Sequence, residues 1–450
     1  MLKIKVEGKK KQVWQAKALE LEERCKQMLL PLLKQVNEKL DVRLVKTLLD
    51  LVLLIVMYRD RHQGLILSEL GGQLLGEEHS PAGSKRVGNL LRSKRWQAAE
   101  IEAYLWELGQ ERVNELMASD RDALVIWDES EIEKPESLKA EGLCPVRSSK
   151  ARRLKRIKPG YFNPPGGRPI CVPGFHWLQV LVTGMEGGLT LTHLGWWTTR
   201  GERATERRSV EQAVLNKVAD LWGRAVIHVF DQGFSGSPWV SALLSAQVRF
   251  ILRWRKDYNL IGPGGEAKKA WQWFRGKRAK DHKVIWDARR RCQRTVGILF
   301  IPVRLPDHAD PFWLVTTRPG PGQKSWYLLT SDPIASTKDA WRIVLAYARR
   351  WRVEMAIRFE KSELGFEAPR LHTWEARFKF LLIATLAYAF LLSLLRNSIE
   401  PWIAALLDTW CHRNGKWSRE TPTPLYRLRL ALSRLWSAFR PAYLPLLTSG

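Results

Sequence analysis

The chain has 450 residues, of which 45% are hydrophobic and 26% are charged. This balance is typical of a globular protein with about two to four domains, and it excludes a disordered or fibrous chain. Its 73 lysines and arginines outnumber its 46 aspartates and glutamates, which gives a net charge of +27 at pH 7. So large a charge repels itself in a folded protein and indicates a polyanionic partner. Nucleic acid fits this best, and an acidic membrane surface is the alternative.

The cysteines and the apolar segments indicate a cytoplasmic protein. The five cysteines are scattered, with no Cys-x-x-Cys pair, so we expect neither a disulfide framework nor a zinc site. The first residues, MLKIKVEGKKKQ, lack the apolar core of a signal peptide. The uncharged run at residues 380–395 falls just short of the roughly 17–25 residues that span a bilayer. We therefore predict a buried helix there and no membrane association.

Residues 1–120 are predicted to form a helical N-terminal DNA-binding region. Apolar residues recur there at intervals of three and four, and strand-like alternation is absent. Two short amphipathic segments, 67–76 and 84–96, are joined by a turn and could form a helix-turn-helix. An ordinary helical pair with a basic surface is the alternative.

Two apolar strands are each followed by an aspartate. Residues 123–127 lead to Asp128, and a later apolar run leads to Asp231. A hairpin and a helix (208–222) are predicted between them. Polar side chains at the carboxyl ends of strands build the sites of α/β proteins. Asp128 could also simply start a loop, and its rivals as ligands are Glu129, Glu131 and Glu133.

A dense basic run follows the first of these strands. Residues 147–158 carry seven cations, and such a segment repels itself unless a polyanion neutralises it. We therefore expect this segment to bind phosphates.

The segment 346–366 is predicted to be the helix around which the protein is organised. Tyr347, Arg350, Glu354 and Lys361 fall within an arc of about 60° on a helix, and Arg358 joins this stripe. A carboxylate framed by cations suits a metal-binding acid beside a phosphate clamp. A solvated face with ion pairs between successive turns is the alternative.

The spacing Tyr-(2)-Arg-(3)-Glu-(6)-Lys in this segment resembles the signature of bacterial insertion-sequence transposases of the DDE class, specifically the insertion-sequence-four family. The sequence DQGF at Asp231 resembles the second-aspartate motif of that family, with Gln232 in place of the usual arginine. The order of strand, hairpin, helix, strand and later helix is also similar to the ribonuclease H-like core of these proteins.

The resemblance implies an α/β fold: a ribonuclease H-like catalytic core with an inserted β-rich domain, flanked by helical N- and C-terminal regions. We assign the first part of the core to residues 121–255 and the insert to residues 256–325. The second part of the core, with the catalytic helix, falls at 326–396, and the helical C-terminal region at 397–450.

The resemblance also implies a catalytic site. Asp128, Asp231 and Glu354 would hold two Mg²⁺ ions, with Mn²⁺ as a substitute. Trp326 would stack on a base flipped out of the duplex, although it could instead pack under a strand. The residues expected to bind DNA are Tyr347, Arg350, Lys361, Trp326, Arg358, Arg152, Arg153, Lys155 and Arg156.

The activity implied is cut-and-paste transposition through a DNA hairpin. The partners would be double-stranded DNA, as terminal inverted repeats and as target, and a second copy of the chain in a synaptic homodimer. Two other hypotheses stay open at this point. One is an inactive or domesticated DNA-binding protein, and the other is a structure-specific DNA nuclease.

Overall fold

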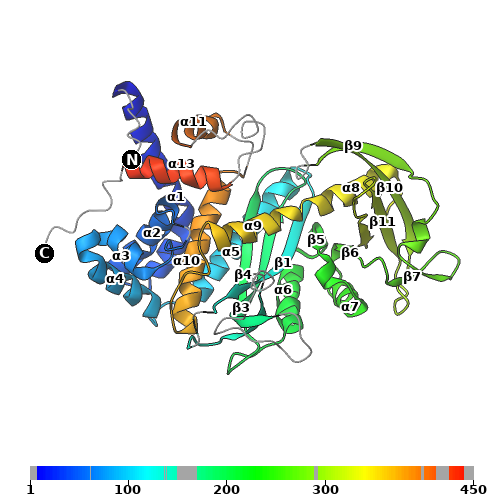
Figure 1. Ribbon diagram of the computed structural model, residues 1–450, viewed down its shortest axis with the longest axis horizontal. Helices are drawn as coiled ribbons and strands as arrows, with labels where there is room; N and C mark the ends of the chain where they lie inside the picture. The colour runs from blue at the N-terminus through cyan, green and yellow to red at the C-terminus, as the bar shows by residue number, and fades with distance from the viewer. Residues whose placement is uncertain are drawn as a thin grey trace.

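The computed structural model describes residues 8–60, 62–135, 137, 139–148, 170–287, 292–396, 400–411 and 425–439. Helices fill one side of the molecule and a large sheet fills the other (Figure 1). Four of the residues expected to bind DNA lie outside the described residues, namely Arg152, Arg153, Lys155 and Arg156.

The N-terminal region is helical, as predicted. Its helices are α1 (Gly8–Asn37), α2 (Val42–Met57), α3 (Leu67–Leu75), α4 (Ser80–Arg92) and α5 (Ala98–Ala118), with the short η1 (Glu77–His79) before α4. The second helix of the predicted pair begins at Ser80, not at Ser84, because Pro81 suits a first helical turn. Helices α3 and α4 meet so closely that a Cβ on Gly83 would lie 2.2 Å from the Gly71 carbonyl oxygen.

The C-terminal helices complete this helical side. They are α10 (Trp374–Ser393), α11 (Pro401–Trp410) and α13 (Leu425–Ala438). Within the described part of the chain, α10 is the one helix long and apolar enough to cross a membrane, and 89% of its most apolar stretch is buried inside the protein. It packs against α2, α4 and α5. It is a core helix here, because its apolar side chains are covered by neighbouring helices and by β4.

The other side of the molecule is a mixed ten-stranded sheet, which confirms the predicted α/β class. Its strands follow the order β2-β3-β1-β5-β6-β12-β11-β10-β9, and β4 also pairs with β3. The first five core strands are β1 (Ala123–Glu133), β3 (Cys171–Thr183), β4 (Leu189–Trp197), β5 (Val226–Phe230) and β6 (Arg249–Arg253). β3 runs antiparallel to β1 and β4, whereas β1, β5 and β6 are parallel. This is the ribonuclease H-like arrangement that the resemblance implied.

Both faces of the central strands are buried, as parallel strands require. Along β1, Leu124 and Ile126 pack into the core shared with the α8–α10 segment. Val125 and Trp127 point to the opposite face, because side chains alternate along a strand. That second face is covered by α6 (Arg207–Trp222) and α7 (Ser237–Ser245), which connect the parallel strands.

Residues 256–325 are β-rich, but most of their strands join the core's sheet. β9 (Asp281–Asp287), β10 (Cys292–Val303) and β11 (Phe312–Arg318) follow one another to β12 (Tyr327–Thr330), which pairs with β6. Only β7 (Asn259–Ile261) and β8 (Ala267–Lys269) form a separate two-stranded sheet among the described residues. The remaining short elements are β2 (Cys144–Arg147), η3 (Gly223–Ala225), η4 (Gln232–Phe234) and η5 (Gln272–Phe274).

Two helices in line, α8 (Thr337–Ala348) and α9 (Trp351–Ser362), run across the sheet from β10 to the helical side (Figure 1). The sequence predicted one continuous helix here, and that prediction is wrong in this detail. At the junction Arg350 N donates to the Tyr347 carbonyl and Val353 N donates to the Arg350 carbonyl. These are bonds over three residues, so a tighter turn separates the two helices.

Candidate active site

The two aspartates lie level with each other on adjacent parallel strands. Ile126 of β1 is paired with Val229 of β5, and two residues further along each strand comes Asp128 or Asp231. Neighbouring strands are about 4.8 Å apart. The sequence predicted that β1 ends before Asp128, but β1 continues to Glu133 because the long strand β3 pairs with it over that whole length. Asp128 therefore stands where the parallel pairing with β5 ends.

The guanidinium of Arg350 brings the third carboxylate to this pair. Its Nη1 lies 3.7 Å from Asp128 Oδ2, and its Nε lies 3.8 Å from Asp231 Oδ1. Its Nη2 donates to Glu354 Oε1, one turn further along α9. Three acids from segments far apart in the sequence thus surround one planar cation, and their catalytic role stays a prediction.

Arg350 is buried and not saturated with hydrogen bonds. Its side chain is 8% exposed, and its Nε and Nη1 have no hydrogen-bond partner among the described residues. Burial works against the charged form, but Tyr347, Asp231 and Glu354 hold the pKa of Arg350 above its ordinary value. Buried donors without partners are costly, so this group is suited to bind a further anionic oxygen.

The carboxyl group of Asp128 has a raised pKa. Burial raises the pKa of its carboxyl to about 7, against the lowering effect of Arg350 and the backbone N–H of Glu129. The charges of Asp231 and Glu354 raise this pKa further. One guanidinium therefore does not neutralise three acids, and the cluster retains affinity for additional positive charge.

Tyr347 and Trp326 form the wall beside Asp231. The Tyr347 hydroxyl donates to Asp231 Oδ1 at 3.2 Å. Burial raises the pKa of Tyr347 to about 12, so the hydroxyl remains a donor at neutral pH. Trp326 is half-buried, and its ring packs edge-on against Tyr347 with 5.0 Å between centroids. Its predicted role in base stacking stays a prediction.

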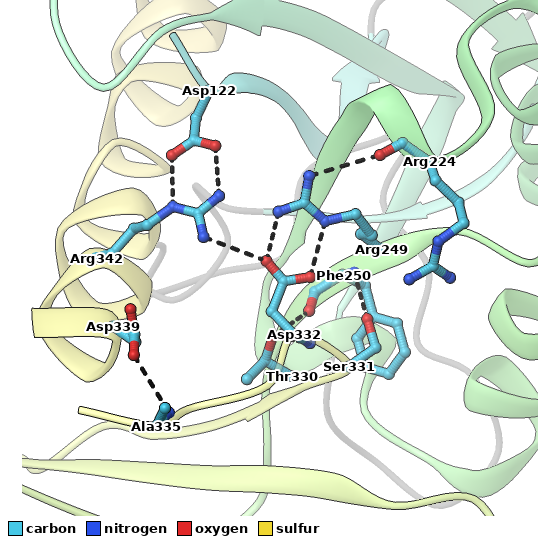
Figure 2. Close-up of polar contacts among 10 residues, drawn as sticks. All are labelled: Asp122, Arg224, Arg249, Phe250, Thr330, Ser331, Asp332, Ala335, Asp339 and Arg342. Carbon is cyan, nitrogen blue, oxygen red and sulfur yellow. Dashed lines mark hydrogen bonds and ion pairs between the residues drawn. The ribbon is translucent and has the colours of Figure 1, made fainter. Parts of the chain in front are cut away.

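The α8–α9 helix pair, which carries Arg350 and Glu354, is held at three places, and the first of them is Arg342 in the middle of α8. Arg342 makes two hydrogen bonds to Asp122, the residue before β1. Arg342 Nη1 also lies 3.8 Å from Asp332 Oδ2, and Asp332 is held by Arg249 at 2.8 and 2.6 Å. Figure 2 shows this network. It lies where β1 and β6 begin, whereas the parallel strands end near the acid cluster.

The junction and the far end of the pair are anchored as well. Arg349 donates to Gly184 O, Thr183 Oγ1 and Gly187 O in the β3–β4 turn, over 2.7–3.1 Å. On the inner face of α9, both carboxylate oxygens of Glu360 accept from Gln179 Nε2 at 3.0 Å. Complete burial raises the pKa of Glu360 well above its ordinary value. These contacts fix the position of Glu354.

The rival acids on β1 turn to other partners. Glu129 pairs with Arg207 at 2.6 Å, and Glu133 accepts from Ser148. Glu131 lies 3.8 Å from His176. None of the three pairs with Arg350 in the described structure. Asp128 is therefore the acid of β1 that lies with Asp231 and Glu354 around Arg350.

The two remaining cations of the predicted stripe lie further along α9. The Lys361 ammonium is 5.8 Å from the centre of the Trp177 ring, and its charge lowers the pKa of Glu131 against the raising effect of burial. Arg358 is exposed. Neither contacts the three acids, and their predicted roles in DNA binding stay predictions.

The donor set of the cluster fits a divalent cation of the magnesium type. Among the described residues, no three Asp, Glu, His or Cys side chains are gathered closely enough to hold a metal ion, since Arg350 stands between the acids. Carboxylate oxygens are nevertheless the ligands that Mg²⁺ prefers. Asp128, Asp231 and Glu354 are therefore the residues that would hold such an ion.

Arg253 belongs to the site although the sequence analysis did not single it out. Its Nη1 lies 4.0 Å from Asp231 Oδ1. A signal was available, because Arg253 ends a strand parallel to β5 and starts the basic sequence RWRK. Parallel strands end at the same edge of a sheet, so its side chain had to come near Asp231.

The strand order and pairing are those of a ribonuclease H-like fold, with three carboxylates at one edge of its sheet. Residues 181–390 match the family model described as the transposase DDE domain. The matched segment contains Asp231 and Glu354 and begins after Asp128. The class that this match supports is that of the DDE transposases.

A cryo-EM structure of the piggyBac transposase synaptic complex with hairpin DNA resembles the chain with a TM-score of 0.42 and 14% sequence identity, covering 91% of this chain and 74% of that chain. No curated protein matches the sequence.

Proposed function

We propose that this protein is a DNA transposase that cleaves and joins DNA at the ends of a bacterial insertion sequence, with the DDE chemistry of the insertion-sequence-four family. The observation that carries the proposal is the meeting of Asp128, Asp231 and Glu354 around Arg350. The match of residues 181–390 to the transposase DDE domain supports it. The net charge of +27 suits a DNA partner.

The residues of the cluster have separate tasks in this proposal. Two divalent cations, Mg²⁺ or Mn²⁺, held by the three carboxylates would stabilise charge on the attacking and leaving oxygens of a phosphodiester. Arg350 offers two buried N–H donors to the phosphate, in the charge-assisted geometry that arginine favours. Tyr347 keeps Asp231 oriented through its hydroxyl.

The reaction we propose is cut-and-paste transposition. Water cleaves one strand at the end of the element, and the freed 3′-hydroxyl attacks the opposite strand to close a hairpin. A second hydrolysis reopens the hairpin, and the 3′-end then joins target DNA. A homodimer would hold the two terminal inverted repeats together, in the bacterial cytoplasm and without a membrane.

The test is a cleavage assay on DNA that carries the inverted repeats flanking the gene. With MgCl₂ we expect a nick at the element end followed by a hairpin product on a denaturing gel, and EDTA should abolish both. Products joined to a second plasmid would demonstrate strand transfer.

The same assay separates the two alternatives. A structure-specific nuclease would cut DNA without hairpin or joined products. An inactive DNA-binding descendant would bind the repeats and leave them intact in MgCl₂ and in MnCl₂. Either result would contradict the proposed function.

A further inference from the structure

A groove of about 850 Å³ opens directly beside the acid cluster. Three segments line it: the turn at 231–233 after β5, residues 253–258 from the end of β6 onward, and Lys324, Ser325 and Tyr327 at the start of β12. Asp231 belongs both to this groove and to the contacts of Arg350. A ligand that reaches the acids can therefore continue into the groove.

The walls of the groove carry an excess of positive charge. Its ionisable side chains are four cations, Arg253, Arg255, Lys256 and Lys324, and two acids, Asp231 and Asp257. Arg255, Lys256 and Lys324 are exposed, and no ion pair joins them to any residue that the structure describes. Cations without ion-pair partners on the walls of one groove are suited to bind a chain of phosphates.

The groove also offers aromatic rings. Tyr258 is half-buried, with the Trp254 ring packed edge-on at 5.6 Å and the Arg255 guanidinium 5.3 Å from its centre. Tyr327 lines the groove too. Trp326 is absent from the lining and packs on Tyr347 instead, because neighbouring residues on an extended segment face opposite sides. Trp254 lines the groove as well but is only 3% exposed, so the more accessible rings of the groove are the two tyrosines.

We propose that this groove holds an unpaired DNA strand that continues from the phosphate at Asp231. The phosphates lie along Arg255, Lys256 and Lys324, and a base stacks on Tyr258. A single strand suits the groove better than a duplex, because a base can stack on an aromatic side chain only when it is unpaired. Cations that follow a backbone beside stacking aromatics are the usual design of single-strand sites. The inference rests on the proposed function, since it names the DNA segment beside the reacting phosphate.

The first test measures binding of a fluorescent duplex with a single-stranded overhang, by anisotropy in EDTA. The double variant Lys256→Glu/Lys324→Glu should raise the Kd by about tenfold or more. The slope of log Kd against log salt should fall by about 1.4, or roughly 0.7 for each lost contact to a single-strand phosphate. A blunt duplex of the same length should bind with less than about twofold change.

The matched control is Lys338→Glu. Lys338 is exposed near the start of α8, at the opposite end of that helix from Tyr347. It should leave overhang binding unchanged, although it alters the charge in the same sense. All of the substituted lysines are exposed, and equal melting temperatures would show that folding is retained. The pair Lys256→Gln/Lys324→Gln should act in the same direction with a smaller effect.

The second test locates the strand. An overhang that contains 5-iodouracil should photo-cross-link to a peptide containing Tyr258, and Tyr258→Leu should remove that product. Cross-linking only outside the groove would overturn the inference. So would equal overhang binding by wild type and by the double glutamate variant.

These failures are distinct from failure of the proposed function. If wild type nicks and joins DNA while the groove variants bind as wild type does, the transposase proposal stands and the groove inference is wrong. If wild type never cleaves but the groove variants lose overhang binding, the groove binds DNA and the transposase proposal is wrong.

Discussion

The parallel strands of the sheet carry an acid–arginine cluster at each end, and the two clusters differ in how well they are satisfied. At the end remote from the site, Asp122 and Asp332 are held by Arg342 and Arg249 through paired hydrogen bonds (Figure 2). At the site, Arg350 faces three acids, two of them at 3.7–3.8 Å. The same side-chain types therefore build a closed network at one end and an open one at the other.

The pKa directions of the acids follow this difference. The hydrogen bonds from Arg342 lower the pKa of Asp122, despite partial burial. Burial raises the pKa of Asp128 to about 7, and Arg350 compensates only in part. A cluster whose charged groups all have hydrogen-bond partners stabilises the fold. A cluster with unpartnered charged groups can gain those partners from a ligand. The comparison predicts that changes at the two ends will affect different properties.

The largest expected effect is on catalysis at the open cluster. Glu354→Gln should lower the rate of DNA cleavage by at least about 100-fold, the usual cost of losing one charge-stabilising group. Single-turnover cleavage on a denaturing gel measures it, with DNA binding as the control. Cleavage at the wild-type rate would reject Glu354 as a member of the triad.

A second expected effect concerns the pH dependence of stability. Because the pKa of Asp128 is raised in the folded protein, its carboxyl group favours the folded state when it is protonated. This stabilising contribution is fully present below about pH 4 and is lost as the pH rises through about 7. Asp128→Asn should therefore match wild type near pH 4 and exceed its free energy of unfolding by up to about 4 kcal/mol at pH 8. Urea denaturation in EDTA gives the comparison.

A loss of stability in Asp128→Asn at pH 8 would show that the open cluster is held together by that carboxylate. Asp122→Asn should behave in the opposite sense. Because the pKa of Asp122 is lowered in the folded protein, its carboxylate stabilises the fold at any pH above about 3.8, the ordinary pKa of the group. It should be less stable than wild type at pH 8.

The third effect lies in the closed cluster. Arg342→Met should cost about 1–2 kcal/mol in the free energy of unfolding, because it leaves Asp122 without its partner in a half-exposed setting. Cleavage at 20 °C should stay within about threefold of wild type, since α8 is also held through Arg349. The measurements are a urea titration and the cleavage rate. A 100-fold loss of cleavage with unchanged stability would contradict the division between the two ends.

The smallest effect is a coupling energy. A double-mutant cycle on Asp122→Ala and Arg342→Ala should give about 0.5–1 kcal/mol of interaction, as expected for a half-exposed pair with two hydrogen bonds. The pair Lys338→Ala and Arg342→Ala should give a small coupling of the opposite sign, because like charges four residues apart on α8 repel each other. Equal coupling in both cycles would mean that Arg342 acts through the helix and not through Asp122.

Parts of the fold were predictable because their signals are local. The strand before Asp231, the hairpin at β3–β4 and the helix α6 each follow from the period of their apolar residues. The arc of Tyr347, Arg350 and Glu354 placed them on one side of the α8–α9 segment, and all three lie at the site. The break at Arg349–Arg350 was missed, because both residues keep right-handed helical dihedrals and no Pro or Gly marks it.

Other features depend on partners that no local pattern names. The extension of β1 past Asp128 requires the length of β3. The union of β9–β11 with the core sheet requires β12 to pair with β6. Arg255, Lys256 and Lys324 read as ordinary surface charges until the fold brings them to one groove.

By itself, the amino-acid sequence determined the kind and order of most strands and helices and which acids follow strands, and it predicted a polyanionic partner, because periodicity and net charge are properties of the chain alone. Only the tertiary structure decided that Asp128, Asp231 and Glu354 meet around Arg350, and that one cluster is saturated while the other is not. The reason is that distances between side chains from remote segments depend on strand register and helix packing, which are set by the whole core.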